Sequence, residues 1–448
     1  MNQNIKKHPL VQRFLDRVCA QVRAKAVHAD IRTEMLHHLE ELYSVKLEEG
    51  MAEAEAIEAA VTQMGDPDVV SKQLNAAHKP KVEWSVISLL IGMLIVGVVT
   101  MFSMYSALDG GVWVERKLFF VVSGLFVMGV LYFIDYRRWL HLSSLLYVSA
   151  LLIMAIAHKQ GVGVEINGAK QYIAVGAFMF NVCAIAPYVL IIAVAGMLHK
   201  EAASGSGSGN ELERLIRFSK NVAIYLLVPT CFFIAAPAIG YLLIYLISVS
   251  VLLIMKGKWK IIVAGSSVIG AFLAIQALYS LNMQFAWERF SGFFHRSSEN
   301  SYYMIRSIEA IHDAGMWGQG FGIATRRLPG IASEMTYSYL IYSLGWVFGL
   351  LVAVLALLFL LRIVKMGLQI QEGYARGLVL GLSSVFAIQY VWCLLMSIGM
   401  LPILGGMQMP IMNWASGTIV ELAVIGLMLG AFRRKDMLGS ATLLKKAG

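Results

Sequence analysis

The sequence is short of charged residues for its length. Only 15% of its 448 residues are Asp, Glu, Lys or Arg, whereas a soluble globular domain carries about 25%. Apolar residues make up 58% of the chain. Several uninterrupted apolar runs approach the roughly 20 residues that a helix needs to cross a bilayer. These features exclude a soluble protein, and the sequence predicts an all-α polytopic membrane protein.

Cysteine is also scarce. The four cysteines are scattered, without the spacing of a zinc site or a disulfide framework. The net charge of +9 would suggest a nucleic-acid partner in a soluble chain, but the basic residues lie mainly in short loops between apolar runs. In such loops they determine membrane topology. We therefore predict no nucleic-acid partner. The sequence identifies no cofactor and leaves a divalent cation as an open alternative.

Residues 1–80 differ in composition from the rest and predict a small cytoplasmic helical bundle. Apolar residues such as Phe14, Leu15, Val18 and Val22 recur at steps of three and four, the spacing of amphipathic helices. Asp66 and Pro67 suit the cap and first turn of the last helix of this unit. Two roles stay open: a bundle that packs only on itself, and a module that docks a partner or the membrane surface.

Ten apolar segments follow, and each predicts a transmembrane helix. They cover residues 84–105, 118–134, 139–157, 181–198, 222–236, 239–255, 261–281, 337–361, 378–395 and 416–432. An even number places both termini on one side of the membrane. The loops on that side carry most of the Lys and Arg, so the positive-inside rule makes it the cytoplasm. We predict a multi-pass protein of the cell membrane with a transmembrane domain at 82–434 and a cytoplasmic tail at 435–448.

The longest polar stretch within this domain is an outer loop at about 282–336, rich in Arg, His, Glu, Tyr and glycine. Two further connections on the same side, 161–180 and 397–415, are too polar or too rich in helix-breaking Pro and Gly to span the membrane. Backbone groups at membrane depth need partners inside the protein. We expect both connections to lie at the interface or fold back into the bundle, as structural loops or as the walls of an outer groove.

Several motifs between 82 and 434 resemble, in order and spacing, the SEDS family of shape, elongation, division and sporulation glycosyltransferases, which includes RodA, FtsW and SpoVE. The residues that carry the resemblance are Asn167-Gly168-Ala169-Lys170, Pro237-Ala238-Ile239-Gly240, Arg289-Phe290, Tyr303, the run Gly315 to Gly322, and Gly399, Pro402, Gly405 and Pro410. Residues 1–80 resemble the helical prefix domain found ahead of some Gram-positive permeases.

The resemblance implies a reaction and its partners. Such enzymes polymerise lipid II, an undecaprenyl-linked disaccharide-pentapeptide, at the outer face of the membrane during growth, division or sporulation. A class B penicillin-binding protein crosslinks the product. Leu344-Gly345 matches the family's E-L-G, and counting back from it places Ser333-Glu334 on the family's T-D pair. Glu334 is then the candidate catalytic acid, and membrane lipids, lipid II and a penicillin-binding protein are the expected partners.

The residue types on this side also suit glycosidic bond formation when the family resemblance is left aside. Forming a glycosidic bond needs a base near the acceptor hydroxyl and positive charge near the leaving diphosphate. Glu334 immediately precedes an apolar span, where partial desolvation suits a base. Arginine suits phosphate, and tyrosine can stack on a sugar face. The candidate substrate-binding residues on this side are Lys170, Arg289, Tyr303, Arg306 and Arg326.

The sequence departs from the family pattern at several positions. The Glu and Lys of the family's P-S-E-x-x-K motif are missing near Ala184 and Pro187, and the candidate acid is Glu rather than Asp. Two alternatives to a polymerase therefore stay open. One is an inactive paralogue that binds lipid-linked precursor or scaffolds an envelope complex, and the other is a precursor transporter. Glu421, inside the last apolar segment, is either a functional intramembrane charge or a structural hydrogen-bonding group.

Overall fold

The structure is a computed structural model, and it describes residues 5–6, 8–22, 28–77, 81–108, 114–159, 163–166, 169–176, 178–203, 210–279, 293–294, 302–324, 328–412 and 416–435. The chain divides into two compact units. One comprises Met1–Val82 with Phe432–Gly448, and the other comprises Glu83–Ala431. Each unit is described by itself.

The N-terminal unit is a bundle of amphipathic helices. They are α2 (Pro9–Gln21), α3 (His28–Glu48), α4 (Glu53–Gln63) and α5 (Pro67–Ala77). Val11, Leu15 and Leu39 are fully buried in its core, as the spacing of apolar residues predicts. The backbone N–H of Asp68 donates to Oδ1 of Asp66 at 2.8 Å. Asp66 therefore caps the start of α5, and Pro67 occupies its first turn without losing a helical hydrogen bond.

The second unit is built from helices, several of which are long enough to cross a membrane. They are α6 (Trp84–Ala107), α7 (Val114–Phe133), α8 (Arg137–His141), α9 (Ser143–His158), α10 (Val182–Ala203), α11 (Glu211–Val222), η2 (Ala223–Leu227), α12 (Val228–Ala235), α13 (Ile239–Met255), α14 (Trp259–Tyr279), α16 (Tyr302–Asp313), α17 (Thr336–Leu368), α18 (Gly373–Ser397) and α19 (Gly417–Arg433). Each of the ten predicted spans overlaps helix within the described residues. Among these residues, six helices are long and apolar enough to cross a membrane. The fold is an all-α multi-pass membrane protein, as predicted.

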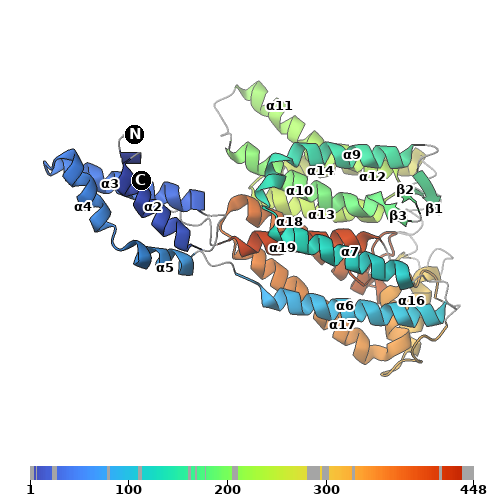
Figure 1. Ribbon diagram of the computed structural model, residues 1–448. Coiled ribbons are helices and arrows are strands. Elements are labelled where there is room, and N and C mark those ends of the chain that lie inside the picture. Colours follow the sequence, from blue (N-terminus) through green and yellow to red (C-terminus); the bar gives the residue numbers. More distant parts are fainter. Residues whose placement is uncertain are drawn as a thin grey trace. The chain divides into compact units, whose positions relative to one another are not determined.

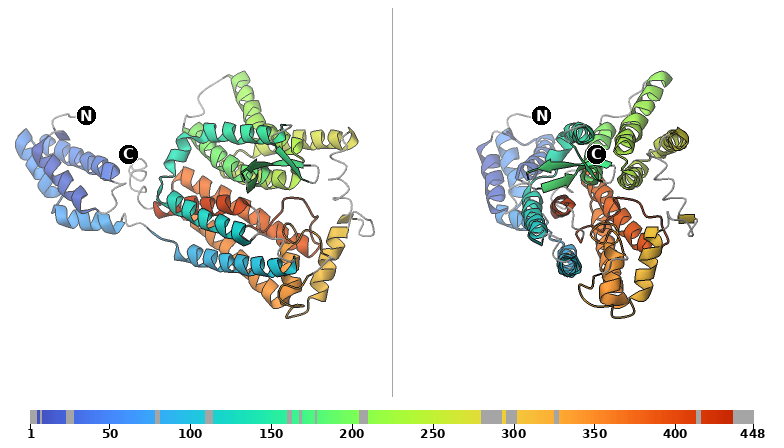
Figure 2. Two further views of the ribbon diagram at one scale, coloured as in Figure 1. Left: turned by 45° about the vertical axis from the view of Figure 1, so that its right-hand side comes forward. Right: turned by 90° about the vertical axis from the view of Figure 1, so that its right-hand side faces the viewer.

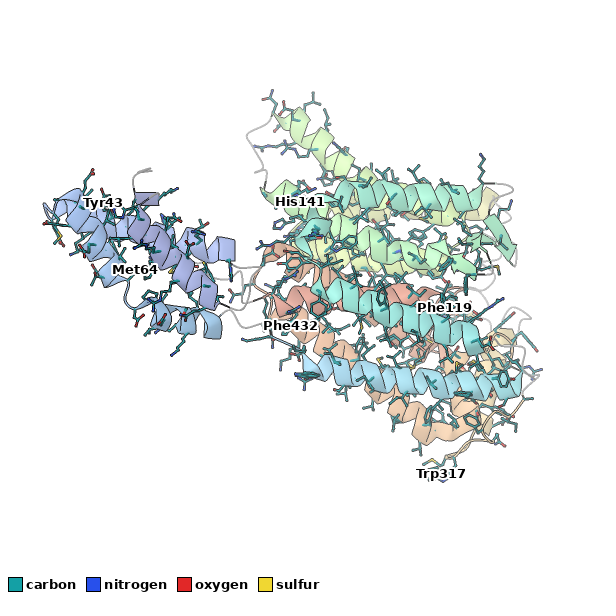
Figure 3. The ribbon with its side chains drawn as sticks, viewed as in Figure 1. Tyr43, Met64, Phe119, His141, Trp317 and Phe432 are labelled. Carbon is teal, nitrogen blue, oxygen red and sulfur yellow. The ribbon has the colours of Figure 1, made fainter. Side chains whose placement is uncertain are left out.

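The polar connections gather at the two ends of this helical unit. The strands β1–β3 and the helix α16 lie at the same end (Figure 1 and Figure 2), which we call the sheet end. The start of α17 and the end of α18 lie at this end too. The basic pair Arg137 and Arg138 lies in α8 together with His141, which Figure 3 shows at the opposite end. This separation places the candidate site residues on one side of the unit.

A small antiparallel sheet occupies the connection between α9 and α10. Its strands are β1 (Gly163–Ile166), β2 (Ala169–Val175) and β3 (Phe178–Asn181), in the order β1-β2-β3. The sequence analysis expected no strands here. The sheet pairs the backbone groups of a segment too polar for a helix in the membrane. The signal that was missed is Asn167-Gly168, because this dipeptide strongly favours a tight hairpin between two short strands.

The sheet packs on α7 through aromatic rings. Phe119 of α7 stacks on Phe178 of β3, with 4.9 Å between the ring centroids and 13° between the planes. Phe120 packs against the same ring at a tilt, with 5.6 Å between centroids. Figure 3 shows Phe119 toward the sheet end of α7. The sheet therefore has a fixed place on the helices.

Helix α17 is interrupted at Gly345, whose φ of 88° lies in the left-handed region. The interruption frees backbone groups, and the loop 315–320 pairs with them. Trp346 N–H donates to the Gly315 carbonyl at 3.1 Å, and Gln319 N–H donates to the Tyr342 carbonyl at 2.9 Å. A Cβ at Gly345 would lie 2.2 Å from the Met316 carbonyl oxygen, so only glycine permits this approach. The loop projects Trp317 outward, with 81% of it exposed (Figure 3).

Helices α7 and α19 approach closely at a glycine. A Cβ added at Gly124 would lie 2.7 Å from Cδ1 of Leu422 and 3.2 Å from Cα of Ile419. Small residues allow this approach in membrane helices, where dispersion rather than hydrophobic force joins the helices. Gly129, on the same helix, has nothing within 4 Å of such a Cβ. The two glycines thus provide a matched pair for testing the contact.

We expect Gly124→Val to lower the free energy of unfolding by about 1–3 kcal/mol, because the added methyl groups overpack the α7–α19 contact. Gly129→Val has the same helix propensity change without the clash, so it serves as the control. Thermal unfolding of both purified variants in detergent measures the difference. Equal melting temperatures for the two variants would contradict the packing described here.

Candidate functional site

Glu334 lies in the turn that directly precedes α17, at the sheet end. Its side chain is half-buried and held at both oxygens. Ser333 Oγ donates to Oε2 at 2.5 Å, and the backbone N–H of Gly406 donates to Oε1 at 3.2 Å. Gly406 belongs to the non-helical residues 398–412 between α18 and α19, which we call the return segment. The candidate acid is therefore joined to a segment that is 72 positions away.

The return segment packs closely on the start of α13. Gly406 has a φ of 90°, and a Cβ there would lie 2.7 Å from the ring of Tyr241. A Cβ at Gly240 would lie 2.2 Å from the Gly405 carbonyl oxygen. Glycine at these positions allows the two backbones to approach, and its freedom at positive φ directs the Gly406 N–H at Glu334.

Asn181 connects the sheet to the helices around Glu334. Its Oδ1 accepts the backbone N–H of Ala184 at 3.0 Å and so caps α10, and its Nδ2 donates to the Tyr241 hydroxyl at 3.3 Å. Asn181 is also the strand partner of Tyr172 in the β2–β3 ladder. One buried amide thus aligns the sheet, α10 and α13 beside the return segment.

Tyr172 is close enough to Glu334 for the two to interact electrostatically. Burial raises the pKa of the Tyr172 hydroxyl above its ordinary value, the hydrogen bond with Asn181 opposes this rise, and the negative charge of Glu334 adds to it. The hydroxyl is therefore protonated and neutral at pH 7. Lys170 is two residues earlier in β2, and the β1–β2 register shifts between the two residues, because Tyr172 pairs with Val164 and Lys170 with Glu165. Their side chains therefore do not share a face by simple alternation. The structure brings the strand that carries Lys170 to Glu334.

The other sequence-predicted residues are placed differently. The buried face of α16 includes Ser307, which shares a 2.6 Å hydrogen bond with Ser338 of α17. Tyr303 and Arg306 lie off this face, and Arg306 pairs with Glu309 at 2.8 Å. Among the described residues no ion pair joins Glu334 to a basic group. The structure thus does not bring Arg306 to the carboxylate.

Two more candidates, Arg289 and Arg326, lie outside the described residues. The divalent cation also stays a prediction. In the part of the chain that the structure describes, no group of three or more His, Cys, Asp or Glu side chains could hold a metal ion.

A small cavity lies beside the return segment. Its lining is partly apolar, and its other lining residues include Tyr188, Tyr241, Gln389, Gly406, Gln408 and Glu421. Tyr188 donates its hydroxyl proton to Oε1 of Gln389 at 2.8 Å. Glu334 does not line this cavity, but Gly406 belongs to both sites. The return segment therefore contacts Glu334 through Gly406 and lines, through the same residue, the cavity that contains Glu421.

The sequence analysis did not single out Asn181, Tyr241 or Gly406 as site residues. Asn181 has a recognisable signal, because Asn directly before an apolar helix is a strong N-cap. Tyr241 lies within an apolar segment, where its position gives no sign of its hydrogen bond. The contact between Gly406 and Glu334 has no local sequence signal at all.

Comparison with models of protein families identifies the family to which the chain belongs. Residues 81–436 match the family model FTSW_RODA_SPOVE, described as cell cycle protein. The chain belongs to this family. It is 23% identical over 377 residues to the probable peptidoglycan glycosyltransferase FtsW of Geobacter sulfurreducens (strain DL-1 / KN400), which covers 81% of this chain and 98% of the relative. It is 22% identical over 337 residues to the stage V sporulation protein E of Bacillus subtilis (strain 168), with 72% and 88% covered.

Solved structures share the fold. RodA of Thermus thermophilus superimposes with a TM-score of 0.57 at 20% identity, over 79% of this chain and 97% of RodA. A chain from work on the structural coordination of polymerization and crosslinking by a peptidoglycan synthase complex gives a TM-score of 0.64 at 22% identity, over 79% and 98%. The membrane unit of this family member therefore has the RodA-like arrangement of helices.

We expect Gly406→Ala to destabilise the protein more than Gly257→Ala does. Both glycines have positive φ, so both substitutions carry the cost of a left-handed alanine, about 1–2 kcal/mol. Only the Cβ at Gly406 also meets the Tyr241 ring, because the space at Gly257 is open. That contact adds about 1–3 kcal/mol. Thermal unfolding of the two variants measures the difference, and equal losses would show that the return segment is loosely packed.

Proposed function

We propose that this protein is a peptidoglycan glycosyltransferase that polymerises lipid II at the outer face of the cell membrane, with Glu334 as its general base. The observation that carries the proposal is the position of Glu334. It is a half-buried carboxylate at the sheet end, held by the return segment and facing the strand that carries Lys170. Membership of the family and the names of the glycosyltransferase relatives support the same reaction.

The proposed step transfers one sugar chain. An acceptor hydroxyl attacks the anomeric carbon of a donor sugar diphosphate. The new carbon–oxygen bond forms while the bond to the diphosphate breaks. Glu334 takes the hydroxyl proton, and the undecaprenyl diphosphate leaves with the bonding electrons. Positive charge near the leaving group stabilises it, and Lys170 of β2, two residues from Tyr172, is the proposed source of this charge.

The proposed orientation puts the sheet end at the outer leaflet and both termini in the cytoplasm. The end opposite the sheet carries Arg137, Arg138, Lys200 and Lys256. Lys and Arg concentrate on the cytoplasmic side of membrane proteins. The proposed partner is a class B penicillin-binding protein that crosslinks the glycan product, which the similarity to a chain of a peptidoglycan synthase complex supports.

A second candidate function is the binding of lipid-linked precursor without polymerisation. The observation that favours it concerns the lining of the small cavity beside the return segment. Ala184 lines this cavity at the place where the SEDS pattern has a glutamate, and Pro187 replaces the lysine of the same motif. A protein that lacks both charges could hold the precursor for another enzyme or scaffold an envelope complex.

We expect Glu334→Gln to reduce glycan polymerisation at least about 100-fold, because losing a general base typically costs 10²–10⁴ in rate. The assay follows strand synthesis from purified lipid II by the full-length protein with its penicillin-binding partner. Glu115→Gln is the control, since Glu115 is an exposed carboxylate at the start of α7. Unchanged polymerisation by Glu334→Gln would remove Glu334 from the mechanism.

The same assay separates the two candidate functions. The wild-type protein binds lipid II in both cases, but only a glycosyltransferase releases undecaprenyl diphosphate. Lipid II binding without any diphosphate release, with the penicillin-binding partner present, would favour the binding role.

A further inference from the structure

Ile411 holds an unusual backbone conformation in the return segment. Its φ is 69°, in the left-handed region, and its side chain is fully buried. For a β-branched residue this conformation is a genuine outlier, because the Cβ substituents crowd the backbone. The surrounding structure must therefore hold Ile411 in place.

Two buried charged side chains contact both polar groups of this residue. Glu421 of α19 accepts the Ile411 N–H through Oε2 at 2.6 Å. Lys117 of α7 donates from Nζ to the Ile411 carbonyl at 3.3 Å and to Thr418 Oγ1 at 2.7 Å. Each of the two charged residues is only 4% exposed, and their charges interact. A charge-assisted hydrogen bond in such a dry site is stronger than one in water.

Lys117 and Glu421, which we call the clamp, affect the candidate site through the return segment. Ile411 is five residues from Gly406, whose N–H reaches Glu334. Between them, the Pro410 carbonyl accepts the Tyr390 hydroxyl at 2.8 Å. A segment fixed at Ile411 and Pro410 has little freedom at Gly406. If Ile411 relaxed to an ordinary extended or helical φ, the chain on both sides would turn and the Gly406 N–H would leave the carboxylate.

We propose that Lys117 and Glu421 are positioning residues for Glu334. They hold Ile411 in its left-handed conformation, and this fixes the Gly406 N–H on the Glu334 carboxylate. They act through the return segment rather than on the substrate. The catalytic consequence rests on the proposed function, whereas the structural part of the inference does not.

Hydrogen–deuterium exchange of the full-length protein in detergent tests the structural part. Lys117→Met should speed amide exchange in peptides covering 404–412 at least tenfold and leave the helix α16 unchanged. Lys365→Met is the control, since Lys365 is an exposed lysine near the end of α17. Exchange in 404–412 within twofold of wild type in folded Lys117→Met would overturn the proposal.

A double-mutant cycle separates positioning from general support. Glycine adopts a left-handed φ readily, so Ile411→Gly should make the clamp largely dispensable. In the Ile411→Gly background, adding Lys117→Met should change the exchange of 404–412 by less than about threefold. The cavity left by the isoleucine side chain is common to both members of that comparison. A tenfold effect that persists in this background would show that Lys117 does not act through Ile411.

One further variant keeps the test decisive if Lys117→Met does not fold, because that substitution leaves Glu421 as an uncompensated buried charge. The double variant Lys117→Gln/Glu421→Gln removes both charges but keeps a donor for the Ile411 carbonyl and an acceptor for its N–H. It should fold and retain slow exchange in 404–412. Fast exchange in this folded variant would refute a hydrogen-bonded clamp.

The catalytic part of the inference is tested in a separate experiment, the lipid II polymerisation assay. In the lipid II assay, Lys117→Met should lower kcat at least tenfold with KM changed less than threefold, because the substrate site is intact and the base is misplaced. Restoration of kcat by Ile411→Gly would support positioning. If the wild-type protein fails to polymerise lipid II while the exchange results hold, the clamp stands and the proposed function fails.

Discussion

Buried backbone that is not helical needs hydrogen-bond partners, and this constraint organises the sheet end. An unpaired buried polar group costs about 1–3 kcal/mol. The return segment meets the requirement with side chains from other elements. Trp392 Nε1 donates to the Pro402 carbonyl at 3.1 Å, and Tyr390 donates to the Pro410 carbonyl. Glu334 and Glu421 accept the N–H groups of Gly406 and Ile411. The candidate base therefore also stabilises the fold around it.

These two roles of Glu334 are compatible. An ionised carboxylate has about four acceptor sites, and the described contacts from Ser333 and Gly406 use one on each oxygen. The remaining sites can receive a proton from an acceptor hydroxyl. A carboxylate fixed by its neighbours needs little reorganisation during the reaction, whereas a misplacement of about 1 Å can cost a hundredfold in rate. Rigid support from the return segment is thus consistent with general-base chemistry.

The charged groups that the SEDS pattern has on α10 are missing, but other helices bring charged groups to the same region. Ala184 and Glu421 line the same cavity, although they belong to α10 and α19. The carboxylate that the pattern has on α10 is missing, but α19 supplies one to the cavity. Lys117 on α7 similarly provides a buried cation beside Glu421. The sheet end therefore keeps buried charged groups of both signs.

The sequence alone determined the membrane class, the apolar segments that form helices and the position of the long polar loop, because hydropathy and length are local properties of a segment. It also singled out Glu334, and the Asn167-Gly168 dipeptide contained the signal for a hairpin. Only the tertiary structure decided what Glu334 contacts and that Arg306 pairs with Glu309. Only the assembled helices brought Lys117 to Ile411, 294 positions away. Such contacts depend on how distant helices pack, and no local pattern of residues encodes them.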